Sequence, residues 1–111
     1  MFDFIGQPLV VGAWVAISGR GNGAAEYGMV LGRVVSLDPL RIERLDVAYF
    51  PGDIRVKRRK SIIKNPNKWV VVQPTAPAIA LWERCAAPSP SQADAQLLGD
   101  WLHGKKTPKF A

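Results

Sequence analysis

Residues 29–50 read MVLGRVVSLDPLRIERLDVAYF, and this stretch decides the fold. It holds two runs, 29–37 and 40–50, that are rich in Val, Ile, Leu and aromatic side chains, which favour strands. Asp38-Pro39 separates the runs, because proline lacks a backbone N–H and restricts the residue before it. The stretch therefore predicts two adjacent strands joined by a short turn.

The second run changes its apolar side along its length. Leu40 and Ile42 share one parity, whereas Leu45 and Val47 share the other. Side chains alternate between the two faces of a strand, so one extra residue in the strand would produce this change. The pattern predicts a β-bulge near Arg44.

Further strands are predicted on both sides of this stretch. Residues 9–18 (LVVGAWVAIS) predict a strand before it, and residues 69–73 (WVVVQ) predict a last buried strand. Residues 54–63 fit either two short strands that meet at a charged bend or one edge strand with a polar middle. A tight turn is expected at 65–67. About five short strands with this spacing favour a small barrel in residues 1–73.

Residues 74–111 differ in character and predict a helical extension of the barrel. Residues 78–86 predict a short helix with Pro77 at its first position, although an extended segment packed on the barrel is an alternative. Residues 91–103 predict a second helix that Ser91 caps, with Asp94 completing the capping pair.

The second predicted helix carries an apolar stripe. Such a stripe packs on its own barrel or on a twin subunit, or it docks in the groove of a partner protein. Gly104 suits the end of this helix. The stripe consists of Leu97, Leu98, Trp101 and Leu102.

Positive charge is concentrated in one segment. The chain has 15 Lys and Arg against 9 Asp and Glu, a formal net charge of +6. Seven of the 15 cations lie in residues 55–68, which contain no acid, so we call 55–68 the basic segment. We expect its side chains to form one continuous outward surface that binds a polyanion. They are Arg55, Lys57, Arg58, Arg59, Lys60, Lys64 and Lys68.

Nucleic acid is the partner that this basic segment favours, because Lys and Arg neutralise phosphates without reading sequence. Tyr49, Phe50 and Trp69 lie near it in the chain and can stack on bases. Two alternatives stay open, an acidic protein surface and an edge strand whose charges only prevent aggregation.

The Gly-rich loop that follows residue 18 is a further candidate contact region. Arg20 and Tyr27 are its candidate contact residues. The loop lacks the Gly-Lys-Ser/Thr ending and the following helix of a phosphate-binding P-loop. We therefore expect a turn here rather than a phosphate-binding loop.

Catalysis and metal binding have little support in the sequence. His103 is the one histidine and Cys85 the one cysteine, and they lie far apart in the chain. Glu43, Asp46 and Asp53 are expected to be solvated surface acids. We expect no enzyme, no cofactor and no metal site.

The first residues do not predict a secretory signal. The apolar run 9–17 has a suitable length, but the residues before it carry Asp3 and no Lys or Arg. No run approaches the roughly 20 apolar residues of a membrane span. We expect a cytoplasmic protein without a membrane partner, in the host cytoplasm if the protein is viral.

Three segments together resemble a known family. GAWVAI (12–17), GMVLGRVV (28–35) and KNPNKWVVV (64–72) occur in the order seen in small SH3-like barrels of bacteriophage proteins. The pattern is more loosely similar to KOW-type barrels of transcription and ribosomal proteins, and it covers roughly residues 8–73. Such barrels bind nucleic acid in some members and protein in others, so the resemblance alone does not choose the function.

The resemblance implies a non-enzymatic binding module. A nucleic-acid-binding barrel is the first expectation. A phage-type factor that binds a host enzyme or a virion component is the alternative, and self-association is open for both.

Overall fold

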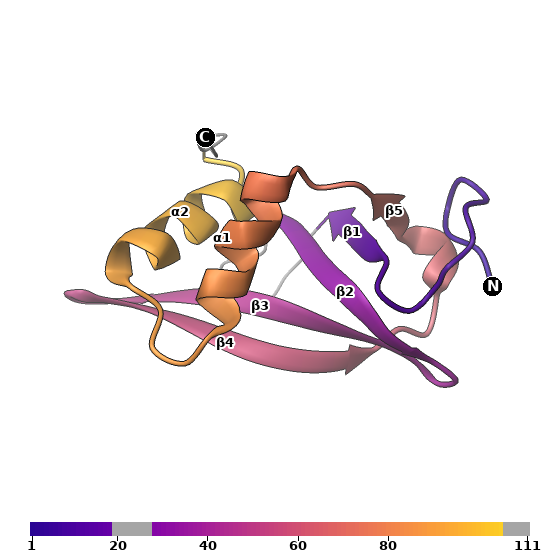
Figure 1. Ribbon diagram of the computed structural model, residues 1–111, viewed down its shortest axis with the longest axis horizontal. Helices are drawn as coiled ribbons and strands as arrows, with labels where there is room; N and C mark the ends of the chain where they lie inside the picture. The colour runs from indigo at the N-terminus through magenta and orange to yellow at the C-terminus, as the bar shows by residue number, and fades with distance from the viewer. Residues whose placement is uncertain (19–27, 106–111) are drawn as a thin grey trace.

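Five antiparallel strands form one sheet, and two helices cover part of one of its faces (Figure 1). The structure is a computed structural model that describes residues 1–18 and 28–105. The strands are β1 (Trp14–Ser18), β2 (Met29–Leu37), β3 (Leu40–Phe50), β4 (Asp53–Ile62) and β5 (Val70–Val72). A 3-10 turn, η2 (Pro66–Lys68), precedes β5, and the helices α1 (Ala76–Ala86) and α2 (Gln92–Leu102) follow it. The predicted mainly β architecture with a C-terminal helical extension is confirmed.

The sheet is open. Its strand order is β4-β3-β2-β1-β5, so β4 and β5 are the two edges. These edges do not pair with each other in the described part of the chain. The strands of the predicted barrel are therefore present, but the sheet does not close.

The β3–β4 hairpin extends beyond the rest of the sheet (Figure 1). Strand β2 pairs with β3 as far as Gly32 and Arg44. Beyond that point β3 has β4 as its only partner strand among the described residues. Residues 45–50 and 53–58 thus form a two-stranded unit, which we call the ribbon.

The predicted bulge near Arg44 is wrong. The register between β3 and β4 runs without a break from Arg41 to Phe50. An irregularity lies instead in β2, between Val34 and Ser36. The apolar side of β3 changes for another reason, which is that different parts of this strand contribute to two cores.

Two apolar cores lie on opposite faces of the sheet. Leu45 and Val47 face the helices, whereas Leu40 and Ile42 face the other way. The first core joins the helices to β1, β2 and β3, and its buried members are Trp14, Ala16, Leu31, Leu45, Val47, Leu81, Trp82, Cys85, Leu98 and Leu102. The second core lies near the turn between β2 and β3, and its buried members are Leu9, Val15, Val34, Leu40 and Ile42.

The first strand is shorter than predicted. It begins at Trp14, and residues 9–13 form an irregular segment. Gly12 has φ +92°, in the left-handed region that breaks extended backbone. Leu9 still packs into the second core, so core packing rather than strand formation explains an apolar residue in this segment.

The later elements follow the sequence more closely. Strand β4 is continuous, which agrees with the single-edge-strand alternative. Helix α1 starts at Ala76, slightly earlier than predicted, because Thr75 caps it by accepting the Ala78 N–H at 3.4 Å. Ser91 accepts the Asp94 N–H at 3.1 Å and caps α2. Neither helix in the described residues has the length and apolar character needed to cross a bilayer.

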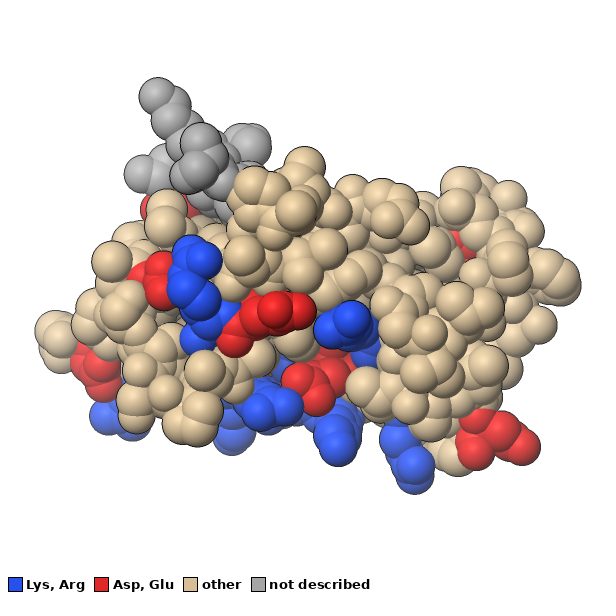
Figure 2. Space-filling model, in the orientation of Figure 1, with Lys and Arg blue, Asp and Glu red and all other residues tan. Residues whose placement is uncertain are grey.

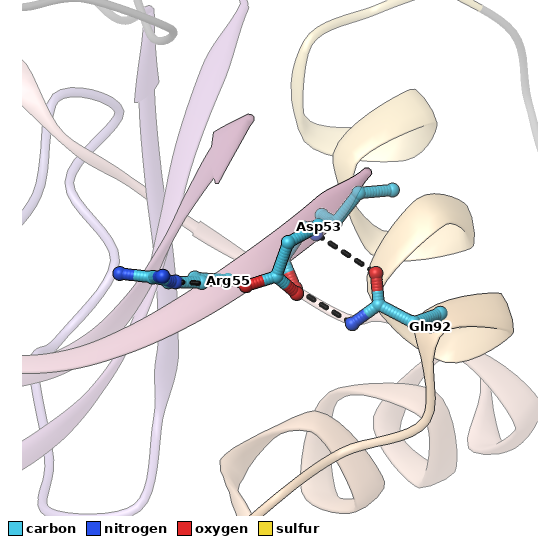
Figure 3. Close-up of polar contacts among 4 residues, drawn as sticks. Asp53, Arg55 and Gln92 are labelled. Atoms are coloured by element: carbon cyan, nitrogen blue, oxygen red, sulfur yellow. Dashed lines mark hydrogen bonds and ion pairs between the residues drawn. The ribbon is translucent and has the colours of Figure 1, made fainter. Parts of the chain in front are cut away.

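Side chains from distant segments close both edges of the sheet. At the β5 edge, the Val71 N–H donates to Oδ2 of Asp3 at 2.7 Å, and Gln7 Nε2 donates to the Val71 carbonyl at 3.1 Å. At the β4 edge, the Ile54 N–H donates to Oε1 of Gln92 at 2.8 Å, and Gln92 Nε2 returns a bond to the Ile54 carbonyl at 3.0 Å (Figure 3). Two side chains at the β5 edge, and one at the β4 edge, thus supply the acceptor and the donor that a neighbouring strand would supply.

Candidate nucleic-acid interface

The cations of β4 divide between the two faces of the sheet. Arg58 and Lys60 project on the side that the helices cover, because they are paired with Leu45 and Glu43. Arg55, Lys57 and Arg59 have the opposite parity and project on the other side. The predicted single continuous surface is therefore wrong for β4, since strand alternation separates its cations.

These cations nevertheless gather along one margin of the molecule. Figure 2 shows Lys and Arg side chains along the margin where β4 lies, with carboxylates between them. Lys64 and Lys68 follow the strand and are exposed as well. Five cations of the basic segment thus form a cationic margin with two sides along β4. Lys68 lies in η2, which leads into β5 at the other edge of the sheet.

The three arginines of β4 that carry this charge also contact carboxylates of the same chain. The acids predicted to be merely solvated each bind an arginine across or along the hairpin. The pairs are Arg55 Nε–Asp53 Oδ2 at 2.9 Å, Arg58 Nη2–Glu43 Oε1 at 2.8 Å and Arg59 Nε–Asp46 Oδ2 at 2.8 Å.

Arg58 has a further structural contact, since its Nη1 donates to the Ala86 carbonyl at 3.2 Å. It therefore holds the end of α1 to the sheet as well as pairing with Glu43. A substitution at Arg58 would disturb this packing in addition to any surface charge.

The four lysines of the basic segment differ from its arginines. They form no ion pair with any described residue, and all four are exposed. An exposed lysine is a mobile point charge that adapts to phosphate positions. The lysines Lys57, Lys60, Lys64 and Lys68 are thus the cations most available to a partner.

The nearby aromatic residues lie in different places. Phe50 lies beneath Arg55, whose guanidinium carbon is 4.4 Å from the ring centroid. Tyr49 turns toward α2, with its hydroxyl 3.3 Å from Nδ1 of His103. Trp69 is half-buried and packs against the second core. Of the three aromatics proposed from sequence, Phe50 is the one that shares a face with Arg55.

The loop candidates Arg20 and Tyr27 lie outside the described residues. Their proposed contacts with a partner therefore stay sequence predictions.

The titratable groups near α2 are in states that suit packing. Burial raises the pKa of Tyr49, and the Asp100 carboxylate adds to this shift. Burial lowers the pKa of His103, and Lys105 acts in the same direction against Asp100. The phenol and the imidazole are thus both favoured in their neutral forms, which suits a hydrogen bond that joins α2 to β3.

The apolar stripe of α2 packs on the chain's own sheet. Leu98 and Leu102 are buried in the first core, and Leu97 and Trp101 are partly buried against it. This is the first of the arrangements that the sequence left open. The stripe is consequently covered within the chain.

A groove of about 410 Å³ lies between α1 and the strands β2 and β3. Its charged side chains already contact neighbours, since Arg33 lies 3.8 Å from Glu83 and Glu43 binds Arg58. The groove is lined by Val11, Gly12, Arg33, Val34, Val35, Glu43 and Trp82.

Neither a metal cluster nor a known relative points to another site. No group of three or more His, Cys, Asp or Glu residues suited to a metal occurs in residues 1–18 and 28–105. Comparisons with protein families, with curated proteins and with solved structures each find no match to this chain. The functional argument therefore depends on the geometry of the cationic margin.

Proposed function

We propose that this protein is a non-enzymatic binding module that contacts nucleic acid through its basic segment. The observation that carries the proposal is the placement of five cations on the exposed edge strand β4, with Lys64 and Lys68 in the segment that follows it. The sequence resemblance to small SH3-like barrels supports the same proposal, because some of these barrels bind nucleic acid. A cytoplasmic location is part of the proposal.

The internal ion pairs leave the basic segment with a net positive charge. Its seven cations have three carboxylate partners, which leaves an excess of four positive charges. Exposed ion pairs contribute only about 0–1 kcal/mol each, so a phosphate can compete with Asp53 and Asp46 for Arg55 and Arg59. Glu43 is only 16% exposed, so its pair with Arg58 is less open to exchange. The lysines need no such exchange. We expect binding that weakens steeply with salt, as counterion release requires.

The β4 edge is also protected from strand pairing by a contact that does not involve its cations. Gln92 closes the β4 edge at Ile54, where the side chain of Asp53 also holds Arg55 (Figure 3). Lys57 and Lys60 lie further along the strand, where their charge discourages strand pairing. Edge protection and phosphate binding are compatible, and a binding measurement separates them.

A protein-interaction factor is the second candidate function, and a different surface favours it. Phe2, Phe4 and Ile5 at the N-terminal end are 60%, 69% and 62% exposed. Exposed clusters of large apolar side chains often mark protein contacts. A phage-type factor that binds a host enzyme or a virion component would use this surface. Light scattering of the wild type and of Phe4→Ser would detect self-association through it.

The test of the nucleic-acid proposal is a triple neutralisation, Lys57→Gln, Lys60→Gln and Lys64→Gln. Lysines are chosen because substitutions at Arg58 or Arg59 would also remove contacts within the fold. Fluorescence anisotropy with a labelled DNA duplex, at several salt concentrations, measures the affinity and its salt dependence. The slope of log affinity against log salt should fall by about 2 to 3, at about 0.9 per phosphate contact.

A matched control separates a local site from overall charge. Arg33→Gln, Arg84→Gln and Lys105→Gln remove the same number of charges at positions outside the basic segment. Arg33 and Arg84 pair with Glu83 and Asp94, so circular dichroism must establish that this variant folds. The proposal requires the control to keep most of the affinity and of the salt slope. Equal losses in both triple variants, or no binding by the wild type at low salt, would reject the basic segment as the site.

A further inference from the structure

We propose that the uncovered face of the ribbon enters the major groove of duplex DNA. This inference depends on the proposed nucleic-acid function and adds to it the form of the nucleic acid and the surface that meets it. We call this surface the ribbon face, and it consists of Asp46, Ala48, Phe50, Asp53, Arg55 and Lys57.

The ribbon has the shape that a major groove accepts. Its two strands stand clear of β2 beyond Arg44, so no third strand widens them in the described structure. Paired strands lie about 4.8 Å apart, and six residues span about 20 Å. The major groove of B-DNA is about 12 Å wide and admits a two-stranded ribbon.

One side of the ribbon is supported and the other is free for a partner. Val47 and Tyr49 lie against α2, close to Gly99. Ile54 and Val56 pack against the first core, to which α2 also contributes. The opposite side is exposed at Ala48, Phe50, Arg55 and Lys57. The helix therefore stiffens the ribbon from behind and leaves the ribbon face uncovered.

The ribbon face carries groups that suit base edges. The Arg55 side chain is 65% exposed, and it is oriented by Asp53 at 2.9 Å and by the Phe50 ring. An oriented guanidinium is the side chain that most often makes a bidentate contact with guanine. Ala48 pairs with Arg55 across the strands, and its small side chain leaves room for a base edge to approach.

Cations beside the ribbon face would meet the phosphates that border the groove. Arg59 continues the row of Arg55 and Lys57 at the base of the ribbon. Lys60 lies on the other side of the same edge strand. A ribbon inserted with β4 toward one phosphate backbone would place both cations near it.

The aromatic content of this surface favours a duplex over a single strand. Single-stranded nucleic acid is usually held by several stacking aromatic side chains along a charged groove. Phe50 is the one aromatic of the ribbon face, and its ring already lies against Arg55. Shape and oriented polar groups, rather than stacking, are what this surface offers, because Arg55 and Lys57 are balanced by Asp46 and Asp53 and the excess of cations lies beside it.

The first experiment compares duplex DNA with duplex RNA of the same sequence, each of about 20 base pairs. The A-form major groove is deep and narrow, so a ribbon cannot enter it. We expect the wild type to bind the DNA at least about tenfold more tightly at equal salt. Equal affinities would overturn the groove proposal and leave the proposed function intact.

The second experiment substitutes the centre of the ribbon face, Ala48→Glu, with Ala93→Glu as its matched control. Ala93 is exposed on α2, so it gives the same change of charge away from the ribbon face. Circular dichroism establishes that both variants fold. We expect Ala48→Glu to lose at least about tenfold in DNA affinity and Ala93→Glu to change less than about twofold.

The outcomes of the two proposals can be told apart. If Ala48→Glu binds DNA as the wild type does while the triple lysine variant does not, the ribbon face is excluded and the basic segment stands. If the wild type binds neither duplex at low salt, both proposals fail.

Discussion

Replacing Leu98 by alanine tests whether α2 packs on the sheet of its own chain. Leu98 is fully buried, at 0% exposure, in the core between α2 and the sheet. Its neighbour Leu97 is only partly buried against the same core. The pair of variants Leu98→Ala and Leu97→Ala therefore makes the same chemical change on the same helix at two different depths.

The expected magnitudes follow from burial. Leu98→Ala removes three carbon groups at about 0.8 kcal/mol each and leaves a cavity, so it should lower the free energy of unfolding by about 3–4 kcal/mol. Leu97→Ala should cost about 1 kcal/mol, because much of that side chain stays in water in both states. A domain of this size has about 5–15 kcal/mol in total, so the deeper variant should still fold.

Urea unfolding followed by tryptophan fluorescence measures the difference. With a slope of about 2 kcal/mol per molar urea, Leu98→Ala should lower the midpoint by about 1.5–2 M and Leu97→Ala by about 0.5 M. Equal midpoints for the two variants would refute the packing of α2 on this sheet. A midpoint that rises with protein concentration would show that the folded state self-associates.

Two further predictions concern buried titratable groups. Burial alone would raise the pKa of Asp3, but hydrogen bonds from Val71 and Gln7 outweigh burial and lower this pKa. The ionised Asp3 carboxylate therefore stabilises the fold fully above pH about 4, and this stabilisation is lost as the pH falls below that value. The difference in the free energy of unfolding between the wild type and Asp3→Asn should narrow between pH 5 and pH 2, around the ordinary aspartate pKa, when it is measured by urea titration. A difference that stays constant over this range would contradict the prediction. Burial, with the Asp94 carboxylate adding to it, raises the pKa of the Cys85 thiol to about 11. A thiol reagent at pH about 8 should therefore label Cys85 slowly in the native protein and rapidly in urea, and fast native labelling would show that the core opens there.

The parts of the fold that could be predicted are those that local sequence determines. The two long strands were predicted with the bounds 29–37 and 40–50, because alternation and the Asp38-Pro39 pair mark them clearly. The second helix was found from its Ser91 cap and its apolar stripe. Each of these signals lies within a few residues of the element it defines.

The errors arise where tertiary packing decides. The change of apolar side in β3 has two explanations, a bulge or burial on both faces, and parity along one strand cannot separate them. The structure gives the second explanation, with Ile42 in one core and Leu45 in the other. Residues 9–13 are apolar because Leu9 fills a core from an irregular segment, which local pattern cannot distinguish from a strand.

The candidate site was predictable in composition but not in arrangement. The concentration of cations in 55–68 is visible in the sequence, and strand parity already separates Arg55 from Arg58. The carboxylate partners depend on the register of β3 and β4, which brings Glu43 to Arg58 across 15 positions of chain. The ribbon face and the role of Gln92 were missed, because both depend on where β2 ends and where α2 docks.

The side-chain closures of the two sheet edges have a consequence for the order in which the molecule can be assembled. Asp3 reaches Val71 across 68 positions of chain, and Gln92 reaches Ile54 across 38. Neither contact can form within a local hairpin, and closing long loops is slow compared with forming turns. Until these two contacts form, the strand margins are bare and can pair between molecules. Dilute refolding conditions should raise the yield of native protein for this physical reason.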